Sequence, residues 1–272
     1  RAMTATSGPG ISLMQENIGY AVGTETPCVI VDVQRGGPST GIPAVPFQGD
    51  MVQVRRGSHG DYEIVAFAPA SAQEMFDLTV LAFNTAEALR VPVFVLADAA
   101  VGHMRETVVI PAADQIPRLD RRLPPPGADP ETLRGFLAEE VAPMPVFGRG
   151  YRAHVTGSCH DAYGMRNVVD APALDTFVRV LCDKVRRQTA SLCRLETEQS
   201  ADAEVLLVGY GLVGRAARAI AMEARAAGLR VGAVRPVTVW PFRVTVNTSP
   251  RSSVISSRAP VPSSTRKRQR NS

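Results

Sequence analysis

Short, almost wholly apolar runs alternate along the chain with longer segments in which apolar residues recur every three or four positions. The apolar runs lie at residues 27–33, 63–67, 92–97 and 204–208. They are typical of strands buried on both faces of a parallel sheet. The periodic segments, which predict helices, lie at residues 11–22, 72–89 and 215–227. This alternation of strands and helices predicts an α/β fold.

Residues at the ends of two predicted helices agree with this pattern. Ser71 stands just before the second periodic segment with Glu74 three positions on, which is the arrangement of an N-terminal capping box. Gly228 follows the third segment and is typical of a helix C-terminus, where a left-handed backbone favours glycine.

Composition divides the chain into four parts. Residues 1–110 hold the first strands and helices, and a Pro-rich connection follows at 111–170. Strand and helix patterns return over 171–243. Residues 244–272 are rich in Ser, Arg, Pro and Thr and have few large apolar side chains, so they predict a disordered tail. A shifted reading frame in the underlying gene is the favoured explanation for this abrupt change.

The positive charge of the chain is concentrated in this tail. The formal net charge is +4, whereas residues 244–272 contain six Lys and Arg residues and no Asp or Glu. The preceding residues are therefore net acidic, and we expect no nucleic-acid partner. A nucleic-acid binder acting through the basic tail stays open as an alternative, although no aromatic residue interleaves the charges.

Nothing in the chain predicts a membrane or secreted protein. The apolar runs fall short of the roughly 20 residues that a bilayer-spanning helix needs, and the first residues lack the pattern of a secretory signal. The four cysteines are scattered and form no Cys-x-x-Cys pair. They predict reduced thiols in a cytoplasmic protein rather than a disulfide framework, a metal site or an iron–sulfur site.

Hydroxyl and glycine residues mark the first turn of the chain. Thr6, Ser7, Gly8 and Gly10 precede or open the first periodic segment, where hydroxyls and backbone amides can bind an anion or a polar ring. A purely structural turn is the alternative from these residues alone, because Gly and Pro occur in turns of every kind.

A second loop follows the strand at 27–33. Arg35 lies at its carboxyl end, where open α/β sheets bind ligands, and a guanidinium can bind a carboxylate through two parallel hydrogen bonds. The loop continues with Gly36, Gly37, Pro38, Ser39 and Thr40. From composition alone a solvated turn is equally compatible with these residues.

In order and spacing these motifs resemble the thiamine-diphosphate domain in the alpha subunit of 2-oxoacid:ferredoxin oxidoreductases. The similarity covers Arg-Ala-Met-Thr-Ala-Thr-Ser-Gly-Pro-Gly at 1–10, Val-Asp-Val-Gln-Arg-Gly-Gly-Pro-Ser-Thr-Gly at 31–41 and Gln-Gly-Asp at 48–50. It continues through Gly-x-His-Gly-Asp at 57–61 and Ala-Pro-Ala-Ser at 68–71. The resemblance implies a partial pyrimidine-type thiamine-diphosphate domain over 1–110. It also implies a partial transketolase-C-terminal-like α/β domain over 171–243, after the connection at 111–170.

The resemblance further implies oxidative decarboxylation of a 2-oxoacid, with 2-oxoglutarate favoured, to an acyl-coenzyme A with ferredoxin as electron acceptor. Arg35 would bind the substrate carboxylate with help from Thr40, in a substrate loop formed by residues 36–39 and His59. The turn at residues 6–10 would bind the cofactor. The cofactor supplies the carbanion chemistry, and the protein positions and polarises the substrate.

Thiamine diphosphate would be shared with a beta subunit that also holds the Mg²⁺ ion and the iron–sulfur cluster. The chain lacks the family's Gly-Asp-Gly signature and cluster cysteines, so we expect it to bind no metal itself. The family's Tyr-Pro-Ile-Thr-Pro segment and its cofactor-activating glutamate are also missing. We therefore expect a chain that is incomplete at both ends, inactive alone and assembled with its beta subunit.

The histidines and one Gly-rich motif offer other interpretations. His160, followed by Asp161, predicts a structural hydrogen-bond anchor, and no spacing joins the four histidines into a metal site. Gly-Tyr-Gly-Leu-Val-Gly at 209–214 follows a predicted strand as in dinucleotide-binding folds, and Arg235 could select a 2′-phosphate. An NADP-binding module over Gly209–Arg235 is therefore the main alternative, although the chain beyond it is too short for a full dinucleotide site.

Overall fold

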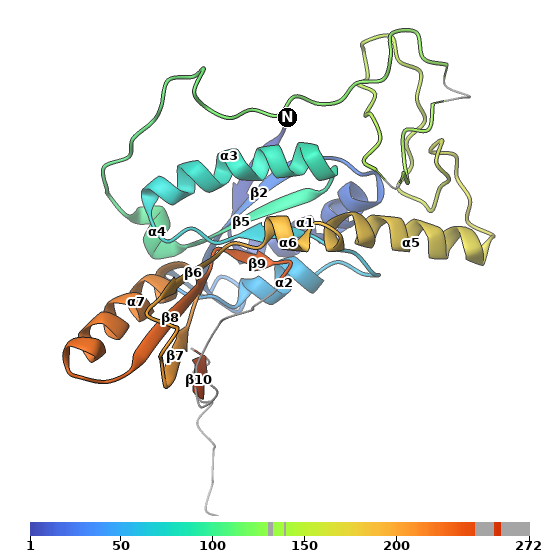
Figure 1. Cartoon of the computed structure of the whole chain (residues 1–272). Coiled ribbons are helices and arrows are strands. Elements are labelled where there is room, and N and C mark those ends of the chain that lie inside the picture. Colours follow the sequence, from blue (N-terminus) through green and yellow to red (C-terminus); the bar gives the residue numbers. More distant parts are fainter. Residues whose placement is uncertain (130–132, 139, 243–252, 257–272) are drawn as a thin grey trace, which may run out of the picture.

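The computed structural model describes residues 1–129, 133–138, 140–242 and 253–256, which form two sheets with helices packed against them (Figure 1). The larger sheet contains β1 (Met3–Thr6), β2 (Cys28–Gly36), β3 (Ile42–Pro46), β4 (Val65–Phe67), β5 (Pro92–Asp98) and β9 (Thr238–Trp240). Its strand order is β1-β2-β5-β4-β9, and β3 pairs with β2 outside this path. β1, β2, β5 and β4 are parallel, whereas β3 and β9 run antiparallel to their neighbours.

The smaller sheet contains β6 (Leu195–Glu198), β7 (Val205–Val208), β8 (Val231–Pro236) and β10 (Ser253–Ser256). Its order is β10-β7-β8-β6, and only β6 is antiparallel to its neighbour. The helix α7 (Gly211–Ala226) packs on this sheet through Ala217 and Ala221, which contact Ala233 of β8. These small side chains let the helix approach the strands closely.

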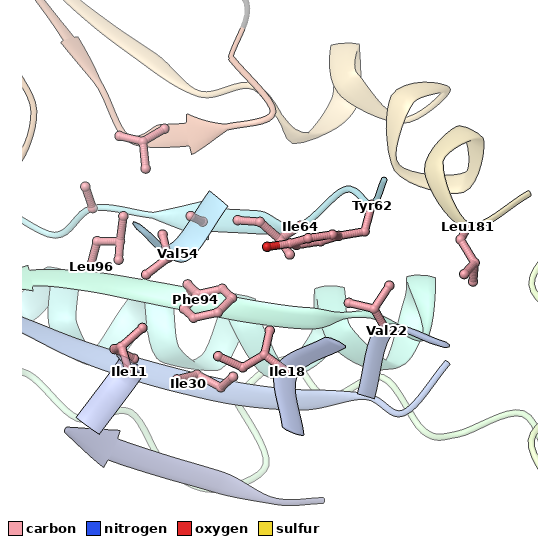
Figure 2. Packing of buried hydrophobic residues seen from close by; sticks show 13 residues of the cluster. Ile11, Ile18, Val22, Ile30, Val54, Tyr62, Ile64, Phe94, Leu96 and Leu181 are labelled. Carbon is pink, nitrogen blue, oxygen red and sulfur yellow. The ribbon is translucent and has the colours of Figure 1, made fainter. Parts of the chain in front are cut away.

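Alternate residues of β2 and β5 build two separate cores in the larger sheet. On one face Ile30 and Phe94 pack against α1 (Gly8–Gly23) and α2 (Asp50–Arg56), as Figure 2 shows. On the other face Val31 and Val93 pack against α3 (Ala72–Leu89). Both strands are therefore apolar on both faces, which explains their continuous apolar sequences.

The α/β class with a parallel sheet is confirmed, and so are the helix ends read from the sequence. The three predicted helices correspond to α1, α3 and α7. Ser71 Oγ accepts the N–H of Glu74 at 3.1 Å, and the Glu74 carboxylate accepts the N–H of Ala70 at 2.8 Å. Gly228 has a φ of +85°, the left-handed conformation expected after a helix.

The remaining helices are α4 (Ala99–His103), α5 (Ala171–Arg186) and α6 (Thr189–Leu192). Leu181 and Val185 of α5 lie in the two cores of the larger sheet, and β9 pairs with β4 of the same sheet. Residues 171–243 thus contribute to both sheets. The domain limits at 110, 170 and 243 stay a prediction.

Only residues 253–256 of the tail at 244–272 are described, and the rest of the predicted disordered segment lies outside the described residues. These four residues form β10, parallel to β7, so the expectation of no regular structure does not hold for them.

A buried ion pair joins α5 to the larger sheet. Lys184 Nζ lies 3.1 Å from Glu25 Oε2 and donates a hydrogen bond of 2.8 Å to the carbonyl of Arg90. Glu25 Oε1 also accepts the N–H of Leu137 at 2.9 Å. Burial raises the pKa of Glu25, but the charges of Lys184 and Arg90, together with the hydrogen bonds from Leu137 and Lys184, outweigh burial and hold this pKa below its ordinary value. Glu25 is therefore ionised at neutral pH, and its charge opposes the lowering of the Lys184 pKa by burial.

Candidate functional site

The carboxyl ends of three parallel strands lie side by side in the larger sheet. Thr6 of β1 is in register with Asp32 of β2, and Asp32 is in register with Leu96 of β5. The turn after β1, the loop after β2 and Asp98 at the end of β5 therefore meet at one edge. This is the edge at which open α/β sheets bind ligands.

Arg35 links the turn after β1 to the loop after β2. Its Nε donates a hydrogen bond of 3.0 Å to Ser7 Oγ, and its Nη1 donates to the carbonyl of Thr40. Within the described ranges, Nη2 makes no hydrogen bond to the protein. The guanidinium is thus oriented by two protein contacts while Nη2 is left for a ligand, which suits a carboxylate.

The loop after β2 turns back on itself and brings Thr40 to Arg35. Gly41 has a φ of +53°, and a Cβ atom there would collide with the carbonyl of Gly36. Only glycine fits this position without strain. Residues 37–40 are exposed, and Thr40 reaches Arg35 through its backbone rather than its hydroxyl. The structure thus gathers Arg35, Ser7 and the loop 36–40, and it shows Gly41 as a further residue that shapes them.

Close packing explains why glycine occurs at positions 8 and 10. A Cβ on Gly8 would lie 2.8 Å from Oδ2 of Asp50, and a Cβ on Gly10 would collide with the hydroxyl of Thr6. Asp50 also accepts the backbone N–H of Gly8 at the start of α1. The glycines therefore let α1 lie directly on β1 and α2, and their contact with a cofactor stays a prediction.

Behind Arg35 lies a set of buried polar side chains that the sequence did not single out. Asp32 and Gln34 of β2 are both 0% exposed, and neither carboxylate oxygen of Asp32 has a hydrogen-bond partner among the described residues. Burial, together with the charge of Asp50, raises the pKa of Asp32 to about 8. Asp32 is therefore a neutral acid at pH 7. The one signal in the sequence was an acid and an amide alternating at the end of an apolar run.

The Gly-rich turn at 209–214 packs against this edge. Asp98 Oδ2 accepts the N–H of Leu212 at 2.6 Å, so a carboxylate of β5 occupies the N-terminus of α7. That is the position where a dinucleotide pyrophosphate would bind. Burial raises the pKa of Asp98 above its ordinary value, and the hydrogen bonds from Leu212 and Gln48 offset only part of this shift.

Arg235 is likewise engaged by protein carboxylates. Its Nη1 and Nη2 donate to the carboxylate of Glu74 at 2.9 and 2.7 Å, and its Nε donates to Glu196 at 2.9 Å. These residues line a cleft of about 480 Å³ between α3, β6 and α7. Because Nε, Nη1 and Nη2 of Arg235 already donate to two carboxylates, few of its N–H groups can bind a 2′-phosphate. The geometry therefore disfavours the NADP-binding alternative.

The structure places His59 away from Arg35. His59 is exposed and follows α2, whose first residue, Asp50, lies against Gly8, whereas Ser58 lies against Gly19 farther along α1. The role of His59 in a substrate loop stays a prediction.

His160 is a structural anchor, as predicted. It is 1% exposed, and its ring nitrogens lie 3.0 Å from the carbonyl of Gly23 and 2.9 Å from that of Asp161. The rings of Phe136 and Phe177 pack edge-on against it. This histidine holds the connection onto the end of α1.

None of the described helices is long and apolar enough to cross a membrane. Among the described residues, no group of three or more His, Cys, Asp and Glu side chains is arranged to hold a metal ion.

Comparison with known proteins identifies the family. Residues 1–179 match the model of the thiamine-diphosphate-binding domain of pyruvate flavodoxin/ferredoxin oxidoreductases, and residues 203–248 match core domain II of pyruvate:ferredoxin oxidoreductase. The chain therefore belongs to the family of 2-oxoacid:ferredoxin oxidoreductases, and the resemblance seen in the sequence is confirmed.

Two named relatives share much of the sequence of this chain. The chain is 50% identical over 243 residues to 2-oxoglutarate synthase subunit KorA of Methanocaldococcus jannaschii, covering 89% of this chain and 64% of the relative. It is 38% identical to ketoisovalerate oxidoreductase subunit VorB of Methanothermobacter thermautotrophicus, covering 89% of this chain and 61% of the relative. The chain thus spans less than two thirds of the length of these relatives.

A solved structure shares the fold. It is the 2-oxoglutarate:ferredoxin oxidoreductase of Magnetococcus marinus with 2-oxoglutarate, coenzyme A and succinyl-CoA bound. The TM-score is 0.81 at 27% sequence identity, and the match covers 93% of this chain and 49% of the other.

Proposed function

We propose that this chain is part of the alpha subunit of an enzyme that oxidatively decarboxylates 2-oxoglutarate to an acyl-coenzyme A and passes the electrons to ferredoxin. The observation that carries the proposal is Arg35, held by Ser7 and Thr40 with Nη2 left for a ligand. Four relatives named 2-oxoglutarate synthase subunit KorA are 41–50% identical to the chain, whereas two relatives named for ketoisovalerate are 37% and 38% identical, which supports the choice of substrate.

In this reaction Arg35 binds a carboxylate of the 2-oxoacid. Ser7 fixes the guanidinium through Nε, and the Thr40 carbonyl fixes it through Nη1, so the substrate meets an oriented clamp. Asp50 lies close to the clamp: burial raises the pKa of Asp50, and the charge of Arg35 opposes this shift.

The turn after β1 fits a polar cofactor. Ser7 accepts a hydrogen bond from Arg35, so its own hydroxyl proton is free to be donated, and Thr6 lies beside it at the carboxyl edge of the sheet. Thr6 and Ser7 would hold thiamine diphosphate together with the backbone at Gly8 and Gly10. When bound, this cofactor supplies the electron sink that decarboxylation requires.

A beta subunit completes the site in this proposal. It shares the cofactor and contributes the Mg²⁺ ion and the iron–sulfur cluster. Exposed apolar side chains next to the clamp loop support such a partner, since Ile42, Val45 and Phe47 are 58%, 41% and 53% exposed. Cys28, Cys159 and Cys182 are free thiols, which supports a cytoplasmic location.

Co-expression tests the proposal. The full-length polypeptide that contains this chain is produced with a candidate beta subunit, and reduction of a viologen dye is measured with several 2-oxoacids. We expect reduction that requires both coenzyme A and 2-oxoglutarate, with ketoisovalerate a poorer substrate. Dye reduction that needs no coenzyme A, or that prefers NADP⁺ as acceptor, would overturn the assignment.

A further inference from the structure

A side chain from the turn of the smaller sheet reaches the strand that carries Arg35. Tyr210 lies between β7 and α7, and its hydroxyl is 3.0 Å from Oε1 of Gln34 and 3.0 Å from the carbonyl of Gln48. Gln34 directly precedes Arg35, and Gln48 stands two residues before Asp50. The single phenolic proton is therefore shared between acceptors on the two segments that flank the clamp.

Further hydrogen bonds fix the backbone of this turn. Gln48 Nε2 donates to the carbonyl of Tyr210 at 3.0 Å and to Asp98 Oδ1 at 3.0 Å. Gly211 has a φ of +52° and no room for a Cβ beside the Asp98 carboxylate. These contacts hold the turn in one conformation and thereby fix the position of the Tyr210 phenol against the larger sheet.

The buried amide of Gln34 depends on Tyr210 for a hydrogen bond. Gln34 is 0% exposed, and its Nε2 has no hydrogen-bond partner within the described residues. The Tyr210 hydroxyl is the group that satisfies its Oε1. Burial also raises the pKa of Tyr210, so the phenol stays neutral and keeps its proton. Without the hydroxyl, neither Oε1 nor Nε2 of this buried amide would have a hydrogen-bond partner within the described residues. Unpaired buried polar groups are costly, so we expect the end of β2 to shift.

We propose that Tyr210 is a positioning residue for the 2-oxoacid. Through Gln34 and Gln48 it fixes the end of β2 and the start of α2, and thereby the guanidinium of Arg35 and the carboxylate of Asp50. This inference rests on the proposed function, because it assigns Tyr210 to the substrate clamp of that reaction. It gives the Gly-rich turn at 209–214 a role that is not nucleotide binding.

The test compares the assembled enzyme as wild type, Tyr210→Phe and Tyr151→Phe. Tyr151 is a matched control because its hydroxyl also donates to a carbonyl, that of Pro124 at 2.9 Å, in the connection. We expect Tyr210→Phe to raise KM for 2-oxoglutarate about tenfold, as the loss of one buried hydrogen bond would. The effect on kcat is smaller, and KM for coenzyme A matches that of Tyr151→Phe.

Two further measurements separate positioning from general damage. The inhibition constant of glutarate, a dicarboxylate that cannot be decarboxylated, should rise by the same factor as KM in Tyr210→Phe. If Tyr210 acts through Gln34, then Tyr210→Phe should add little to KM in an enzyme that already carries Gln34→Met.

An unchanged KM in Tyr210→Phe, or additive effects in the double variant, overturns the role of Tyr210 and leaves the proposed function intact. If Tyr210→Phe does not assemble, Gln34→Met is compared with the wild type in its place, and an unchanged KM and glutarate inhibition constant there overturn the role as well. A wild-type enzyme without 2-oxoacid-dependent activity overturns both.

Discussion

Asp32 provides a sharp test of the electrostatics of the site. Its side chain is enclosed in the larger sheet, with no hydrogen-bond partner for either oxygen among the described residues. Burial and the charge of Asp50 raise its pKa to about 8. The native state therefore holds a proton that the unfolded chain releases near its ordinary pKa of about 4. Because the native pKa is the higher one, this group makes stability fall as pH rises from about 4 to about 8.

Replacing Asp32 with Asn removes this dependence and keeps a neutral side chain of the same shape. Relative to the wild type, the unfolding equilibrium constant of the variant should fall about tenfold for each pH unit in that window. Between about pH 4.5 and pH 7 the advantage grows to about 3 kcal/mol. For a protein of this size that is roughly 6 to 12 °C in the midpoint of thermal unfolding.

The assay is thermal unfolding followed by circular dichroism at a series of pH values. Asp61→Asn serves as the control, because Asp61 is an exposed carboxylate and its removal changes the net charge equally. A difference between wild type and Asp32→Asn that stays constant from about pH 4.5 to 7 would refute the conclusion that Asp32 is held as a neutral acid.

Three other substitutions test the contacts around the sheet. Lys184→Met leaves the Glu25 carboxyl buried without its partner, so denaturant unfolding should show a loss of about 3 to 5 kcal/mol, partly recovered by adding Glu25→Gln; no loss contradicts a stabilising role for the pair. Gly41→Ala cannot fold the loop back past Gly36, so KM for the 2-oxoacid should rise at least tenfold with little change in the unfolding midpoint. Ser7→Ala frees Nε of Arg35 and should raise the same KM by about three- to tenfold, and an unchanged KM would show that this contact does not orient the clamp.

Much of the larger sheet could be predicted from local pattern. The strands β2 and β5 are covered by helices on both faces, so their apolar runs stand out from the surrounding sequence. By contrast β1 has an exposed pattern, and β9 has only three residues. Such short edge strands form because a neighbouring strand is already in place, which no local window can show.

Part of the candidate site could likewise be predicted from the sequence, and part of it could not. Arg35 and the turn at residues 6–10 could be singled out because ligands bind at strand ends and because the motifs resemble those of a known family. The hydrogen bond from Arg35 to Ser7 spans 28 positions, and that from Tyr210 to Gln34 spans 176. Contacts of this range depend on the tertiary fold.

The Gly-rich turn shows how a motif can mislead. Its sequence fits a phosphate-binding turn, yet the N–H of Leu212 is taken by Asp98, a residue 114 positions away. Gly214 lets the side chain of Arg235 pass, and that guanidinium pairs with Glu74 and Glu196. Gly211 lets this turn approach Asp98 of the larger sheet, and Gly214 lets α7 pack against Arg235 of β8, which the motif alone does not distinguish from nucleotide binding.

The central claim is that Arg35 binds the carboxylate of a 2-oxoacid, and KM for 2-oxoglutarate in the assembled enzyme tests it most directly. Arg35→Ala is compared with Arg56→Ala, which removes an exposed arginine from the end of α2. We predict that Arg35→Ala raises KM for 2-oxoglutarate about a hundredfold and leaves KM for coenzyme A unchanged, whereas Arg56→Ala alters neither. Equal KM values for 2-oxoglutarate in Arg35→Ala and Arg56→Ala would contradict the claim.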